Sequence, residues 1–230
     1  MTHPEIVQSL LDIYEVPRYL EVGVFEGKTL RQLEASEKIG IDPEFAFDRA
    51  VMEVDPRCTL HEVSSDEYFG RIATSSAQFE VIFLDGLHTF EQTLRDFINA
   101  LAHLAPGGVI VVDDVTPISH LAATPDPKRF QHLRQMLQVK SGAWMGDVFR
   151  LVYFLETFFQ QITFRTIAET DSQLVAWRAT RERVPERTVA AVAGLSFEDM
   201  LFERESYSPL SFEAILDEVR AQAGAQPAGA

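Results

Sequence analysis

Four side chains that could bind a metal ion or move a proton follow two short apolar runs near the middle of the chain. Asp85 and His88 come after the first run, and Asp113 and Asp114 come after the second. Carboxylate oxygens are the ligands that Mg²⁺ prefers, and three like charges placed together favour a cation. An imidazole is a natural proton acceptor near neutral pH. This set predicts metal-assisted proton transfer, unless the acids are separate and hydrated and the histidine only bonds to the backbone at a helix start.

The elements that must position these four side chains are recognisable in the sequence. Residues 81–84 and 109–112 are predicted strands, and an amphipathic helical pattern with a Pro-Gly-Gly turn at 106–108 joins them. A strand–helix–strand unit makes its two strands parallel, so their carboxyl ends meet at one edge of the sheet. In open α/β sheets this edge is where ligands bind.

The whole pattern predicts an α/β fold, a doubly wound and mostly parallel seven-stranded sheet with helical additions at both ends. The expected helices are 4–15, a helix after Gly27 with Leu30 and Leu33 on one face, 66–74, 90–104, 128–139, 147–159 and, more weakly, 195–222. The expected strands are 19–24, 39–42, 59–63, 79–84, 109–112, 162–167 and 173–177, the last two antiparallel. We expect one domain over 1–180, a C-terminal helical extension over 181–222 and a disordered tail over 223–230.

A turn with two glycines follows the first predicted strand. Gly23 and Gly27 let the backbone pass close to a ligand, and the next helix offers free N–H groups, although two glycines can equally be ordinary turn chemistry. Asp42 ends the second strand, where an acid either accepts the two hydroxyls of a ribose or caps the following turn. Phe25 stands where a dinucleotide fingerprint has its middle glycine, which disfavours NAD.

The spacing of these residues resembles that of the class I S-adenosylmethionine-dependent methyltransferases. The resemblance rests on Glu21-x-Gly23-x-x-x-Gly27, Asp42, Ser65-Asp66 after the third strand, and Asp85 after the fourth. The block DGLHTFEQTLRDF…LAPGGVIVVDD and the segment Trp144–Val148 are similar to one branch of this class. That branch includes magnesium-dependent O-methyltransferases of small molecules and sugars, the macrocin and mycinamicin type.

The resemblance implies a role for each matching residue. The cofactor-binding set is Glu21, Gly23 and Gly27 for the methionine portion, Asp42 for the ribose, Ser65 and Asp66 beside the adenine, and Asp85. His88 and Asp85 match catalytic positions, with His88 as the general base. Asp85, Asp113 and Asp114 match the Mg²⁺ ligands, although relatives that bind magnesium often carry Glu at the position of Asp113.

The predicted function is transfer of a methyl group from S-adenosylmethionine to a small-molecule acceptor, a sugar or natural-product hydroxyl, with His88 as base and Mg²⁺ as a second cofactor. Because the sulfonium donor is already activated, the protein mainly aligns the acceptor and handles its proton. Two alternatives are a nucleotide-binding Rossmann oxidoreductase and a non-catalytic cofactor-binding partner subunit. Phe25 counts against the first, and the four chemically competent side chains count against the second.

Composition and charge narrow the expected partners. The chain has 230 residues, 46% of them hydrophobic, and a formal net charge of −15, so nucleic acid and anionic membranes are not expected as partners. Cys58 is the one cysteine, which excludes an intramolecular disulfide and a CxxC metal site. The sequence shows neither a signal peptide nor an apolar run of membrane-spanning length. We expect a soluble cytoplasmic protein and leave a homo-oligomer open.

Overall fold

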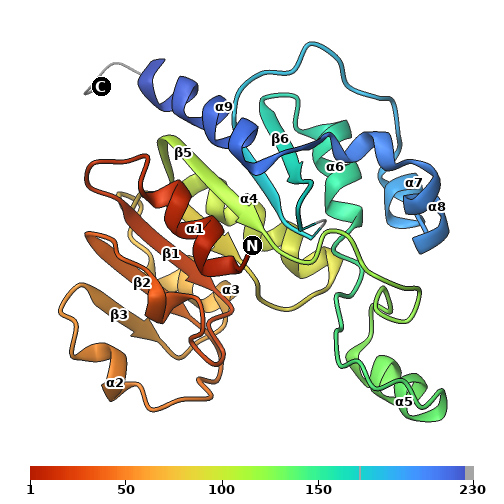
Figure 1. The fold of residues 1–230 in the computed structure, drawn as a ribbon, viewed down its shortest axis with the longest axis horizontal. Helices are drawn as coiled ribbons and strands as arrows, with labels where there is room; N and C mark the ends of the chain where they lie inside the picture. Colours follow the sequence, from red (N-terminus) through yellow and green to blue (C-terminus); the bar gives the residue numbers. More distant parts are fainter. Residues whose placement is uncertain (171, 226–230) are drawn as a thin grey trace.

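An eight-stranded, mostly parallel sheet with helices on both faces forms the framework of the protein, in a computed structural model that describes residues 1–170 and 172–225 (Figure 1). The strand order is β3-β2-β1-β4-β5-β7-β6-β8. The strands are β1 (Arg18–Val22), β2 (Glu37–Ile41), β3 (Cys58–His61), β4 (Phe79–Leu84), β5 (Leu104–Val112), β6 (Ile162–Ile167), β7 (Leu174–Arg178) and β8 (Pro209–Leu210). The predicted fold class is confirmed, and the two-residue β8 makes eight strands where the sequence predicts seven.

Strands β1, β4 and β5 lie in the middle of the sheet. Most residues of β4 and β5 are apolar and buried, which is typical of parallel strands with helices on both sides. Val22 at the end of β1 pairs with Leu84 at the end of β4, and Leu84 pairs with Val112 at the end of β5. The residues that follow these three strands therefore start from neighbouring points on one edge of the sheet.

Helices cover both faces of the sheet and enclose an apolar core on each. The longer helices are α1 (His3–Leu11), α4 (Phe90–His103), α5 (Pro127–Met136), α6 (Arg150–Phe158) and α9 (Phe212–Ala225). The shorter elements are α2 (Ala50–Glu53), α3 (Ser65–Glu67), α7 (Val189–Ala193), α8 (Phe197–Phe202) and the turns η1 (Leu30–Gln32), η2 (Tyr68–Ile72) and η3 (Arg204–Tyr207). Ile6 of α1 and Ile215 of α9 belong to one core, and Phe97 of α4 and Val152 of α6 belong to the other (Figure 1).

The helix expected after Gly27 is wrong, because a single 3-10 turn, η1, takes its place. Glu37 at the start of β2 pairs with Arg18 at the start of β1, so residues 28–36 must run back along the whole of β1. The five residues of β1 span about 13 Å, and a helix of that length would use all nine residues and leave none for the loop that leads into β2. The segment is therefore more extended, and the N–H groups of a helix N-terminus are not offered at this turn.

The C-terminal part of the chain adds an antiparallel finish to the sheet and then returns to it. β7 is antiparallel to both β5 and β6, as the sequence predicts. β8 pairs with β6, and α9 packs on β5 and β6, so the extension over 181–222 contributes to the same fold. Of the predicted disordered tail, residues 223–225 form the end of α9, and residues 226–230 lie outside the described residues.

An arm between β5 and α6 carries α5 and projects from the layered body of the fold (Figure 1). The helix expected over 128–139 corresponds to α5, which begins at Pro127, where proline suits the first helical turn. Within residues 1–170 and 172–225, none of the helices is long and apolar enough to cross a membrane.

Candidate active site

Asp85 and Asp113 stand side by side where β4 and β5 end. The N–H of Asp85 donates to the carbonyl oxygen of Val22 (2.8 Å), and the N–H of Asp113 donates to the carbonyl oxygen of Leu84 (3.0 Å). Burial, together with the nearby charges of Asp113 and Asp114, raises the pKa of Asp85 well above its ordinary value. The structure thus brings the three predicted carboxylates to one edge of the sheet.

His88 pairs with Asp114 at the same edge. Nδ1 of His88 lies 3.1 Å from Oδ2 of Asp114. Asp114 has a φ of 60°, a left-handed conformation that aspartate tolerates better than most residues. Burial lowers the pKa of His88 and raises the pKa of Asp114 to about 8, with the charge of Asp113 adding to the second shift. When Asp114 is ionised, which a nearby cation favours, Nδ1–H of His88 donates to the carboxylate, and Nε2 is then the nitrogen that can receive a substrate proton.

Residues 144–147 hold the segment that carries His88. Oδ1 of Asp147 accepts a hydrogen bond from the N–H of Phe90 (2.8 Å), at the start of α4. Gly146 has a φ of 60°, and a Cβ atom there would lie 1.6 Å from the carbonyl oxygen of His88, so glycine is required. The indole of Trp144 meets the imidazole edge-on, with 5.3 Å between the ring centroids. This segment, singled out by its resemblance, fixes the position of the candidate base.

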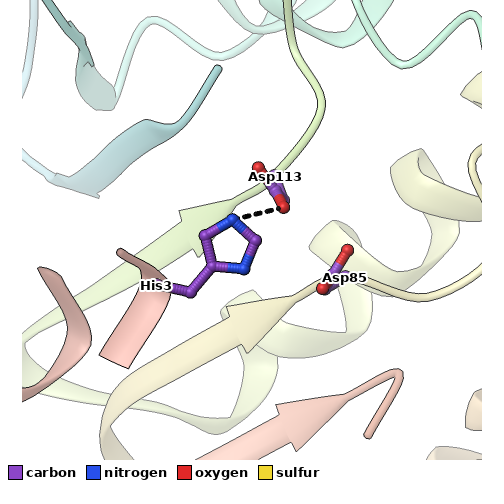
Figure 2. Close-up of side chains that lie close together, drawn as sticks. All are labelled: His3, Asp85 and Asp113. Atoms are coloured by element: carbon purple, nitrogen blue, oxygen red, sulfur yellow. Dashed lines mark ion pairs between the residues drawn. The ribbon is translucent and has the colours of Figure 1, made fainter. Parts of the chain in front are cut away.

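His3, at the start of α1, joins the acids although nothing in its sequence context marks it. Figure 2 shows the imidazole of His3 next to Asp113 and near Asp85, and Nε2 of His3 lies 3.1 Å from Oδ2 of Asp113. The sequence marks only the start of the helix that carries His3. Thr2 and Glu5 form a capping box there, and a proline occupies the first turn. That signal places a histidine at a helix end, but the contact with β5 depends on how α1 packs on the sheet.

The site holds two groups of possible metal ligands that share Asp85. One group is His3, Asp85 and Asp113, and the other is Asp85, His88 and Asp114. Within each group the candidate ligand atoms all lie within 4.8 Å of one another. Buried carboxylates need a proton or a cation to balance their charge, and carboxylate oxygens with imidazole nitrogens suit a divalent ion. The donor set at this edge therefore fits a metal centre.

The edge of the sheet that carries Asp85, Asp113 and Asp114 is called the acid edge below. A cavity of about 930 Å³ opens beside it. Its volume is in the range of small-molecule binding sites. The predicted cofactor-binding residues that line it are Glu21, Gly23, Asp42, Ser65, Asp66 and Asp85. His3 and His88 also line the cavity, as do Phe130, Arg134 and Trp144 of the arm. One cavity therefore connects the predicted cofactor residues with the candidate base.

Glu21 is a buried acidic residue in the wall of this cavity. The hydroxyl of Tyr19 donates to Oε2 of Glu21 (2.7 Å), and the residue is 2% exposed. Burial raises the pKa of Glu21 to about 8, even though the hydrogen bond from Tyr19 acts in the opposite direction. A buried carboxyl group of this kind gains its ionised form when a cation, such as an ammonium group, comes within contact distance.

Backbone conformation and close contacts within the chain account for the two glycines of the turn. Gly23 has a φ of 93°, and a Cβ atom there would lie 2.0 Å from the carbonyl oxygen of Asp85. Gly27 has a φ of 68°, and a Cβ atom there would lie 3.0 Å from the ring of Phe47. Gly23 is thus needed for the close approach of the turn to β4. Contact of either glycine with a ligand stays a prediction, and Gly27 is not part of the cavity wall.

Asp42 caps the glycine turn and also faces the cavity. Its Oδ2 accepts a hydrogen bond from the N–H of Phe25 (2.8 Å), and its Oδ1 accepts one from the N–H of Glu44 (2.9 Å). These contacts agree with the capping role, one of the two interpretations that the sequence leaves open for Asp42. Each carboxylate oxygen has a second lone pair, so ribose binding is compatible with the cap.

Ser65 and Asp66 lie at the start of α3 and are held by side chains of α4. Nε2 of Gln92 donates to Oγ of Ser65 (3.2 Å), and Nη1 of Arg95 lies 2.6 Å from Oδ2 of Asp66. Asp96, one turn further along α4, also lines the cavity, and burial raises its pKa to about 6. The resemblance predicts that the adenine lies at this polar end of the cavity.

The sequence of the central strands matches a known domain. Residues 20–115 match the family profile described as a methyltransferase domain, and this range runs from within β1 to just beyond the end of β5. An uncharacterized protein, R132, of Acanthamoeba polyphaga mimivirus is 26% identical over 130 residues, or 49% of this chain. The chain spans 58% of the length of that curated relative.

Solved methyltransferases share the fold. An O-methyltransferase from Bacillus cereus, solved in complex with S-adenosylhomocysteine, aligns over 75% of this chain and 79% of its own, with 18% identity and a TM-score of 0.51. The MycE methyltransferase of the mycinamycin biosynthetic pathway aligns over 80% of this chain and 51% of its own, with 18% identity and a TM-score of 0.51. The match of residues 20–115 to a methyltransferase domain and the fold shared with these enzymes both agree with the resemblance found in the sequence.

Proposed function

We propose that the protein transfers a methyl group from S-adenosylmethionine to a hydroxyl group of a small molecule, with His88 as general base and a divalent cation, Mg²⁺ by the sequence prediction, at the acid edge. The observation that carries this proposal is the His88–Asp114 pair, because it lies at the cavity that Glu21 and Asp42 also line. The methyltransferase domain over residues 20–115 supports methyl transfer as the chemistry.

The cavity wall offers a partner for each part of the cofactor. When bound, S-adenosylmethionine supplies a methyl group on a positively charged sulfur. Glu21 is placed to accept the ammonium group of the methionine portion, and Asp42 has lone pairs left for the ribose hydroxyls. Ser65 and Asp66 form the polar end of the cavity that suits the adenine. The Bacillus cereus O-methyltransferase, which has the same fold and binds S-adenosylhomocysteine, supports this assignment.

His88 handles the proton of the acceptor. Its lowered pKa leaves the imidazole neutral near pH 7, and an Asp114 carboxylate kept ionised by the proposed cation accepts from Nδ1–H, so Nε2 can act as the base. Nε2 would take the hydroxyl proton of the acceptor, and the bound cofactor would supply the methyl group to the acceptor oxygen, its sulfur keeping the electron pair of the broken carbon–sulfur bond. A cation held by Asp85, Asp113 and Asp114 would lower the pKa of a hydroxyl bound to it.

A sugar or natural-product hydroxyl is the acceptor that we propose. MycE, which has the same fold, is solved in complex with Mg, S-adenosylhomocysteine and mycinamycin VI. In this chain Phe130, Arg134 and Trp144 bring aromatic and cationic surface from the arm to the cavity, which suits a ring with polar substituents. The expected cytoplasmic location and homo-oligomer stay predictions.

Calorimetry and a transfer assay together test this function. We expect S-adenosylhomocysteine to bind with micromolar or better affinity and NADH to give no heat; the reverse result would identify a Rossmann oxidoreductase instead. Radiolabelled S-adenosylmethionine should then label hydroxylated sugars and macrolides. Binding without transfer to any acceptor in the panel would favour a non-catalytic partner subunit, and labelling of amines alone would exclude an O-directed enzyme.

A further inference from the structure

His3 turns part of the acid edge into a mixed nitrogen and oxygen site. Its Nε2 lies 3.1 Å from Oδ2 of Asp113, in the group of ligand-type atoms that also includes Asp85 (Figure 2). The histidine is held in place by α1, whose side chains Ile6 and Leu10 are fully buried against the sheet. The packing of α1 on the sheet therefore sets where His3 meets the strand ends.

Nε2 of His3 has two polar neighbours that require opposite hydrogen-bonding roles from it. Nε2 of His3 lies 3.1 Å from Oδ2 of Asp113 and 3.2 Å from Nε2 of Gln173, while that same amide nitrogen lies 2.5 Å from Oδ1 of Asp113. A protonated Nε2 can donate to the carboxylate but then faces an amide donor. An unprotonated Nε2 can accept from the amide but then turns its lone pair toward a carboxylate oxygen. A cation shared by that lone pair and the carboxylate removes the second conflict.

The amide of Gln173 supplies an independent observation. Gln173 is 4% exposed, and its Oε1 has no hydrogen-bond partner within residues 1–170 and 172–225. Because Oε1 and Nε2 belong to one planar amide whose nitrogen contacts both His3 and Asp113, the unpaired oxygen lies at the edge of the same cluster. A buried acceptor without a donor is costly, and an ion with its bound water relieves that cost.

The observed spacing suits two ligands of one metal ion. Neighbouring ligands around an octahedral ion with bonds of about 2.0–2.2 Å lie roughly 2.8–3.1 Å apart. The 3.1 Å between Nε2 of His3 and Oδ2 of Asp113 falls at the upper end of that interval. The side chains therefore need little rearrangement to share an ion.

We propose that His3 is a metal ligand together with Asp85 and Asp113, and that its nitrogen makes the centre select a first-row transition ion such as Mn²⁺ or Zn²⁺ over Mg²⁺. Mg²⁺ favours an all-oxygen shell, whereas a shell that includes imidazole favours the later first-row ions. This inference rests on the cation in the proposed function and changes its identity.

Mn²⁺ is the probe for the test, because its electron spin echo is modulated by a directly bound nitrogen. We expect nitrogen modulation in the wild-type protein and an affinity for Mn²⁺ that exceeds the affinity for Mg²⁺ on the order of tenfold or more. His3→Ala should lose the modulation and weaken Mn²⁺ binding. His3→Gln offers an oxygen in place of the nitrogen, so it should lose the modulation and the preference for Mn²⁺. His132→Ala, an exposed histidine of α5, should match the wild type.

Each other outcome overturns the inference in a distinguishable way. Modulation that survives His3→Ala but disappears in His88→Ala would assign the ion to the second group. Equal affinity for Mn²⁺ and Mg²⁺ without nitrogen modulation would leave the cation of the proposed function and remove His3 from its ligands. If no divalent ion binds, both metal proposals fail, while titration of the same sample with S-adenosylhomocysteine still reports on the methyltransferase. If His3→Ala does not fold, His3→Gln carries the test, because loss of the modulation in that variant assigns the bound nitrogen to His3.

Discussion

Nδ1 of His88 lies 3.1 Å from Oδ2 of Asp114, and the two residues come from the ends of different strands. His88 follows β4, and Asp114 follows β5, so the pair exists only because the two strands are parallel neighbours. The contact orients the imidazole and leaves Nε2 as its reactive nitrogen. The pair therefore links the topology of the sheet directly to the proposed proton transfer.

If His88 is the base, His88→Ala should lower turnover by roughly 10²–10⁴-fold, the usual range for loss of a general base. Turnover of the wild type should rise with pH along a limb that lies below the ordinary histidine pKa of 6.5, because burial lowers the pKa of His88. The variant should lose that limb and keep its affinity for S-adenosylhomocysteine. A purely structural histidine would instead give a lower melting temperature with turnover per folded molecule retained. His132→Ala serves as the control.

Gly146→Ala tests whether the segment 144–147 positions the base. The new Cβ atom would stand 1.6 Å from the carbonyl oxygen of His88, at a φ of 60°, so the segment must move. Strain of this kind costs about 1–3 kcal/mol of stability, and displacement of a base by about 1 Å costs on the order of 10²-fold in rate. Gly70→Ala, where nothing lies within 4 Å of the new atom, is the matched control. Unchanged turnover in Gly146→Ala would show that His88 does not depend on this contact.

The central strands and the acid edge could be predicted because their causes are local. Strands buried on both faces appear as contiguous apolar runs, and residues after parallel neighbours must share an edge, so Asp85, His88 and Asp114 were expected together. The turn that replaces the helix after Gly27 follows from the few residues left before β2, whose start at Glu37 pairs with Arg18, and no local pattern contains that pairing. β8 consists of two residues and exists only because it pairs with β6.

The part of the site that the sequence does not predict, formed by His3 and Gln173, also depends on contacts between distant elements. His3 contacts Asp113 because α1 packs across the sheet, and the apolar face of α1 predicts a helix but not the strand that it covers. Gln173, the residue before β7, reaches the same carboxylate because β7 is antiparallel to β5. Contacts that depend on the packing of distant elements produce no recognisable spacing of residues in the sequence.

Asp42→Ala should weaken binding of S-adenosylhomocysteine by about 1.5–3 kcal/mol if Asp42 binds the ribose, because a charge-assisted hydrogen bond is lost. Since Asp42 also caps the N–H groups of Phe25 and Glu44, calorimetry with an analogue that lacks the ribose hydroxyls is needed as well. The wild type should discriminate strongly between the two ligands, and the variant should not. Equal loss of affinity for both ligands would show that Asp42 acts only through the turn.

A divalent cation at the acid edge should raise the melting temperature, because a ligand that binds only the folded state stabilises it. At a hundredfold excess over Kd the gain is about 2.7 kcal/mol. Asp85→Asn should reduce or abolish the gain, because Asp85 belongs to both groups of possible ligands, whereas Glu213→Gln, an exposed acid of α9, should keep it. Differential scanning fluorimetry with millimolar Mg²⁺ and Mn²⁺ measures the effect. An unchanged melting curve together with activity that survives EDTA would leave the acids as hydrogen-bonding groups.

The stability of the protein should fall as pH rises from about 4.5 to 8, through the titration of Glu21. Its pKa is raised to about 8 in the folded protein from an ordinary value of 4.5, so in this window the folded state keeps a proton that the unfolded state has released. The contribution of Glu21 is complete below pH 4.5 and is lost as pH passes the folded pKa, and at 1.36 kcal/mol per unit it amounts to at most about 5 kcal/mol. Glu21→Gln keeps an acceptor for the hydroxyl of Tyr19 and should flatten this slope in urea unfolding measured across the window, while the exposed control Glu182→Gln should not. A slope that is the same in Glu21→Gln and the wild type would mean that another group carries the pH dependence.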